Sequence, residues 1–68
     1  MENRSSLSSR EKEVIGLLAK EMYENEIAAY LQVDVAFVKV TISNLMRRTS
    51  TMSLVGLVKE AVKQGWIA

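Results

Sequence analysis

Apolar side chains recur along this chain at spacings of three and four residues, with short polar interruptions between the periodic segments. The pattern covers residues 8–20, 24–31, 35–48 and 53–64. This spacing places the apolar side chains along one face of a helix, and four such helices can bury these faces against one another. The sequence therefore predicts an all-α fold, a compact domain of four helices.

Residues that favour helix ends stand where the periodic segments begin and stop. Ser8 and Glu11 form an S-x-x-E capping box, in which each side chain bonds an unpaired amide of the first turn. We expect the side chain of Asp34 to cap the third helix and Ser53 to open the fourth, which stops at Gly65. These residues fix the register of the predicted helices.

The predicted helices share one apolar core. Its expected members are Val14, Ile15, Leu18, Met22, Ile27, Leu31, Val35, Val38, Ile42, Leu45, Met46, Leu54, Leu57, Val58 and Ala61. A chain of 68 residues buries only about 60% of its unfolded surface, so we expect a small free energy of unfolding. Residues 26–47 read as a short helix, a three-residue turn and a longer helix, which is the signature of a helix-turn-helix.

The third predicted helix has one face without a role in the core. Counting 100° per residue, this face comprises Val40, Ser43, Asn44 and Arg47, with Lys39 at its flank. Positions 36–58 contain no acidic residue. A helical face that lacks carboxylates and carries cations and small or amide side chains suits insertion into the major groove of DNA.

The fourth predicted helix has a second apolar strip, about 90° around from its core stripe. The strip consists of Val55 and Val62, with Trp66 just beyond the helix end. One buried face of so small a domain does not need this width. The strip predicts a dimer seam, or Trp66 folds back to cover the core; both alternatives stay open.

The charges of the chain are divided between its two halves. The net charge is −3 for residues 1–34 and +4 for residues 35–68. Such asymmetry favours a basic face for a polyanion, although ordinary solvated charge is an equally open interpretation. The cations of the basic half are Lys39, Arg47, Arg48, Lys59 and Lys63.

Composition excludes several classes of function. The chain has no Cys and no His, which excludes disulfides, thiolate or imidazole metal sites and the common nucleophile–base pairs. Its paired glutamates stand two apart on predicted helices and point in different directions. We therefore expect no enzyme, no cofactor and no metal. With neither a membrane-spanning run nor a signal peptide, we expect a cytoplasmic protein, with a flexible lead at residues 1–6 and a single domain at 7–68.

Three motifs occur in a characteristic order and spacing. They are the opening Leu7, Ser8, Arg10, Glu11, Glu13 and Val14, the triplet Glu26, Ile27 and Ala28, and the pair Val38 and Lys39. From residue 7 to about 64, the chain resembles the LuxR-type (GerE-like) DNA-binding domain of bacterial transcription regulators. The resemblance implies a four-helix fold whose third helix enters the major groove and whose fourth helix pairs two subunits on a two-fold DNA site.

The resemblance also assigns roles to single positions. It implies contacts with bases or phosphates for Lys39, Val40 and Ser43. Asn44 and Arg47 join them from the helical count alone, and the adjacent Arg48 adds charge. The positions implied for subunit pairing are Val55, Lys59 and Val62, on the strip that also includes Trp66.

Several positions depart from the family pattern. Phe37, Thr41 and Leu54 replace a customary Thr, His and Arg, which removes polar groups that could anchor the DNA backbone. We expect Phe37 to cover an apolar gap, with contact to a thymine methyl or to a protein partner as alternatives. Glu21 stands where the family usually has Gly, so we expect a rearranged first loop.

Two functions follow from these observations. The first is sequence-specific binding of double-stranded DNA, as a homodimer, for transcriptional regulation. The alternative is a LuxR-like protein-interaction module that pairs with another transcription regulator and modulates it without binding DNA itself.

Overall fold

Four helices joined by short loops make up the described part of the chain. The structure is a computed structural model, and it describes residues 7–67. The helices are α1 (Ser9–Ala19), α2 (Glu24–Leu31), α3 (Val35–Thr49) and α4 (Leu54–Gln64), with no strand in that range. The predicted all-α, four-helix fold is confirmed. The flexible lead predicted for residues 1–6 lies outside the described residues.

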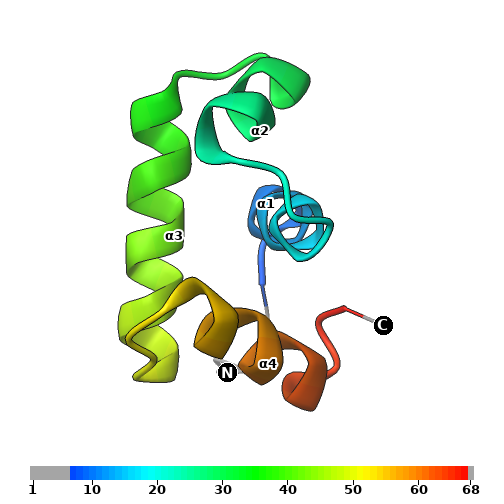
Figure 1. The fold of residues 1–68 in the computed structure, drawn as a ribbon, viewed down its shortest axis with the longest axis vertical. Helices are drawn as coiled ribbons and strands as arrows, with labels where there is room; N and C mark the ends of the chain where they lie inside the picture. Colours follow the sequence, from blue (N-terminus) through cyan, green and yellow to red (C-terminus); the bar gives the residue numbers. More distant parts are fainter. Residues whose placement is uncertain (1–6, 68) are drawn as a thin grey trace.

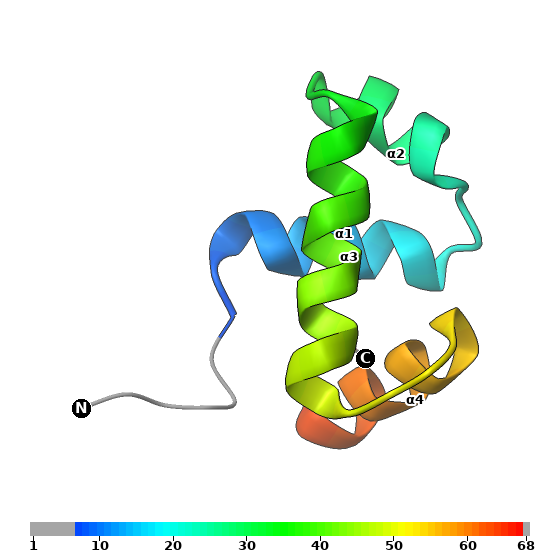
Figure 2. The ribbon, with the colours of Figure 1, turned by 90° about the vertical axis from the view of Figure 1, so that its left-hand side faces the viewer.

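The longest helix, α3, lies along one side of the domain. In Figure 1 it stands upright at the left, with α2 beside its upper end, α1 to the right of its middle and α4 beside its lower end. Figure 2 looks onto α3, which runs in front of the other helices and crosses α1. One face of α3 is therefore turned away from the rest of the protein, while the opposite face closes the core.

All four helices contribute to a single apolar core. Its buried members are Val14, Ile15, Leu18, Ile27, Ala28, Val38, Ile42, Leu45, Leu57 and Ala61. Ile15, Ile27, Leu45 and Leu57, which come from four different helices, are 0% exposed. Because each of these side chains is removed from water by residues of other helices, the fold depends on packing between helices.

Two of the three predicted helix caps are confirmed. The Glu11 amide donates to Ser8 Oγ at 3.1 Å, and the Ser8 amide donates to the Glu11 carboxylate at 3.0 Å. At the start of α4 the Gly56 amide donates to Ser53 Oγ at 3.0 Å. The prediction for Asp34 is wrong in its mechanism: the residue occupies the N-cap position, but its side chain makes no capping bond and its carbonyl accepts the first helical bonds.

The rearranged first loop was also a wrong prediction. Glu21 keeps a left-handed backbone, with φ of 66°. Its amide donates to the Leu18 carbonyl at 2.9 Å, and the Met22 amide donates to the Leu17 carbonyl at 3.3 Å. These bonds satisfy carbonyls at the end of α1 that would otherwise be unpaired. Glu21 therefore adopts the strained left-handed conformation, and the loop is not rearranged to avoid it.

The extent of the core and of α3 differs from expectation at three positions. Val35 and Leu54, both predicted in the core, are 40% and 43% exposed. They are the first residues of α3 and α4, and a first turn can project past the helices that cover the later turns. Thr49, predicted in a linker, is the last residue of α3, where its hydroxyl donates to the Leu45 carbonyl at 2.8 Å.

Candidate nucleic-acid interface

The outward face of α3 carries the side chains that the sequence singled out. Val40 is 58% exposed, and Lys39, Ser43 and Arg47 are also exposed, whereas Asn44 is partly buried. Because α3 runs in front of the other helices, this face is open along its length (Figure 2). The structure therefore brings five of the six predicted contact residues to one open helical surface.

Asn44 and Arg47 are joined on this surface by a hydrogen bond. Arg47 Nη2 donates to Asn44 Oδ1 at 3.1 Å, one helical turn away. The bond holds the guanidinium group along the helix, with its remaining donors available to an acceptor in front of α3. Among the cations of α3, Arg47 is the one that points away from the domain by the helical count and forms no ion pair within the described residues.

Arg48, the sixth predicted contact, is turned toward α1. Its Nη1 atom lies 3.2 Å from Oε2 and 3.3 Å from Oε1 of Glu11. Glu11 belongs to the capping box of α1, so this pair ties the end of α3 to the beginning of α1. A role for Arg48 in contacting DNA stays a prediction, and any such contact would compete with Glu11.

Lys39 forms an ion pair with the helix that precedes α3. Its Nζ atom lies 3.7 Å from the Glu24 carboxylate in the first turn of α2. The side chains are 62% exposed for Lys39 and 35% exposed for Glu24. Local sequence patterns do not indicate this partner, because the two residues are fifteen positions apart and on different helices.

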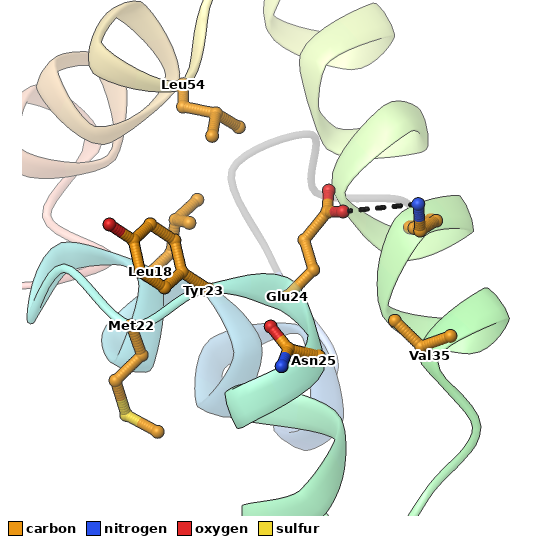
Figure 3. Close-up of a pocket in the computed structure, with 8 residues that line it drawn as sticks. Leu18, Met22, Tyr23, Glu24, Asn25, Val35 and Leu54 are labelled. Atoms are coloured by element: carbon orange, nitrogen blue, oxygen red, sulfur yellow. Dashed lines mark ion pairs between the residues drawn. The ribbon is translucent and has the colours of Figure 1, made fainter.

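An open hollow lies beside this ion pair. It is lined by Leu18, Met22, Tyr23, Glu24, Asn25, Val35, Lys39 and Leu54. In Figure 3, Leu54 descends from α4 toward the hollow, Tyr23 lies across from it, and the dashed line marks the ion pair. Leu54 stands where the family pattern has Arg, so this edge of the domain presents an apolar side chain in place of a cation.

The other two departures from the pattern differ in their surroundings. Thr41 is 7% exposed, so its hydroxyl lies inside the domain, away from any ligand of the outer face. Phe37 is 41% exposed, and by the helical count it lies on the same side of α3 as Arg48, eleven residues later. Part of its ring is therefore accessible at the surface beside the candidate interface.

The second apolar strip is present on α4. Val55 is 71% and Val62 51% exposed, with Lys59 exposed between them. Trp66 is partly buried and packs against the core, which is the second of the two alternatives left open for it. Its part in a dimer seam stays a prediction.

The described residues form neither a cluster of metal-binding side chains nor a membrane-spanning helix. Within residues 7–67, no three acidic, His or Cys side chains come together in a group that could hold a metal ion. In this range, no helix is both long enough and apolar enough to cross a membrane.

Comparison with known proteins identifies a family for this chain. No curated protein sequence shows a significant similarity to the chain. The model of a family described as bacterial regulatory proteins, luxR family, matches residues 5–61. This match covers the three motifs, α1 to α3 and the greater part of α4. The chain therefore belongs to the luxR family of bacterial regulatory proteins.

Proposed function

We propose that this chain is a cytoplasmic, sequence-specific DNA-binding domain that inserts the outer face of α3 into the major groove and regulates transcription as a homodimer. The observation that carries the proposal is the open face of α3, where Lys39, Val40, Ser43, Asn44 and Arg47 lie together. An α-helix fits the width of the major groove, where base edges can be distinguished by their hydrogen-bonding groups.

The family supports the general part of this proposal. It is a family of regulatory proteins that bind DNA, and not an enzyme family, which agrees with the expectation of no catalytic function. The chemistry of each candidate side chain suits contact with a different part of the DNA. Lys39 and Arg47 attract phosphates, Ser43 and Asn44 offer hydrogen bonds to base edges, and Val40 suits contact with a thymine methyl.

Dimerisation through α4 is expected to be weak in the absence of DNA. The strip formed by Val55, Lys59 and Val62 occupies one side of a helix of eleven residues. A stable protein interface usually involves about 20–30 residues on each side. The two subunits should therefore pair mainly when adjacent half-sites, about one turn of duplex apart, hold them together.

The test is selection of duplexes from a random pool, followed by fluorescence anisotropy with the selected sequence over a range of salt concentrations. We expect wild-type binding to weaken with salt. Lys39→Ala should weaken it further and lower the salt slope by about one per subunit. The matched control is Lys12→Ala, which removes the same charge from an exposed position on α1.

The outcomes separate the two candidate functions. Loss of affinity in Lys39→Ala with unchanged helical content, and little change in Lys12→Ala, supports the proposal. If no duplex in the pool shows salt-sensitive binding at low ionic strength, DNA binding is refuted. Amide shifts in α3 that respond to another regulator but never to DNA would favour the protein-interaction module.

A further inference from the structure

Two of the three cations on α3 are paired with carboxylates of other helices. Arg48 pairs with Glu11 of α1, and Lys39 pairs with Glu24 of α2. Glu11 also closes the capping box of α1, so its carboxylate has a structural role. Glu24 has no second partner of this kind among residues 7–67, where its carboxylate bonds Lys39 alone.

We propose that Glu24 is a negative determinant of DNA affinity, which acts by holding the ammonium group of Lys39 away from the duplex. This inference rests on the proposed DNA-binding function, and it concerns the strength of binding at the same α3 face. Glu24 lies outside the contact residues named above, on the helix that precedes the recognition helix.

The position of Glu24 is fixed by the fold. The turn that presents it is held by two hydrogen bonds, from the Tyr23 amide to the Glu26 carboxylate at 2.8 Å and from the Ile27 amide to the Tyr23 carbonyl at 2.9 Å. Ile27 is 0% exposed and anchors α2 in the core. The backbone of Glu24 therefore stays beside α3, within reach of Lys39, whose longer four-carbon side chain is the more flexible of the two.

Binding of DNA brings a second anion into competition for Lys39. By the helical count, Lys39 flanks the outward face, so its ammonium group must turn away from Glu24 to reach a phosphate or a base edge in front of α3. The carboxylate is then left without its cation close to the DNA. Positions 21–38 contain four acidic residues and no Lys or Arg, so no neighbouring cation in the sequence replaces Lys39.

The size of the effect follows from the exposure of the pair. Both partners are accessible to solvent, and exposed ion pairs of this kind change an equilibrium by about two- to fivefold. We expect Glu24→Gln to bind the selected duplex about two- to fivefold more tightly per subunit than wild type at low ionic strength, with a smaller gain at high salt.

The experiment is a comparison by fluorescence anisotropy of wild type, Glu24→Gln and Glu13→Gln on the selected duplex. Glu13 is the matched control because its substitution removes the same charge, and its carboxylate pairs with Arg10 within α1. Circular dichroism checks that each variant keeps its helical content. The same Glu24 substitution is then measured in a Lys39→Met background, where its gain should fall to that of Glu13→Gln.

The outcomes distinguish a failure of this inference from a failure of the proposed function. A larger gain for Glu24→Gln than for Glu13→Gln, which disappears in the Lys39→Met background, supports the inference. Wild-type binding that Glu24→Gln does not strengthen, or a gain that persists without Lys39, overturns this inference and leaves the proposed function standing. Absence of binding by wild type and by every variant at low ionic strength overturns the proposed function, and this inference with it.

Discussion

Replacing Glu21 with Gly should stabilise the domain, because the backbone at this position is left-handed. The φ angle of 66° brings the Cβ atom close to the following carbonyl oxygen, which costs roughly 1–2 kcal/mol for a residue other than Gly. Within the described residues the exposed Glu21 side chain forms no hydrogen bond or ion pair that would be lost. Gly65 shows the favourable case, since it ends α4 with φ of 80°.

The expected gain is smaller than the strain itself. Glycine increases the conformational entropy of the unfolded chain, which lowers the free energy of unfolding by about 0.4–1 kcal/mol and so cancels part of the gain from relieving the strain. The net increase in the free energy of unfolding is therefore about 0.5 kcal/mol, which corresponds to a rise in Tm of about 2–4 °C for a domain of this size. Thermal unfolding followed by circular dichroism at 222 nm measures this change directly.

Glu21→Gln is the control for charge. It removes the same carboxylate from the negative end of α1 and keeps the Cβ atom, so any electrostatic gain appears in both variants. The difference in Tm between Glu21→Gly and Glu21→Gln isolates the backbone strain. A Glu21→Gly protein that melts at or below the temperature of Glu21→Gln would refute the reasoning.

Two further predictions concern the core and the α4 strip. Leu57 is 0% exposed, so Leu57→Ala should lower the free energy of unfolding by about 2–5 kcal/mol, and urea denaturation with a midpoint equal to that of wild type would contradict this. Val62 is 51% exposed, so Val62→Asp should change Tm little but abolish the preference for a two-fold duplex over a single half-site. An unchanged preference in anisotropy titrations would show that Val62 has no part in pairing the subunits.

Local patterns in the sequence were sufficient for the helices and for most of their ends. Apolar spacing predicted all four segments, since a helix places residues three and four apart on one face. The Ser8–Glu11 box and the Ser53 cap could be read because both partners lie within three residues. The exposed face of α3 followed from the same counting, together with the family motifs.

Contacts between helices could not be read in the same way. Lys39 and Glu24 are fifteen positions apart, and Arg48 and Glu11 are thirty-seven apart, so nothing in their local sequence indicates that they meet. The helices must first dock before these side chains come within a few ångströms. From the sequence, Lys39 and Arg48 were predicted only as cations that contact DNA. The tertiary structure shows that each of them forms an ion pair with a carboxylate of another helix.

Burial at the helix ends was likewise decided by the tertiary structure. Periodicity assigns Leu54 to the core stripe of α4, but the stripe is covered only where a neighbouring helix reaches, and Leu54 lies at the rim of the hollow. Trp66, left open between two roles, turns back onto the core once Gly65 reverses the chain. The sequence by itself determined which segments are helical and which face of α3 is polar, because these depend on neighbours three or four residues away. Only the packed structure decided which of its charges are already paired, because that depends on residues far apart in the chain.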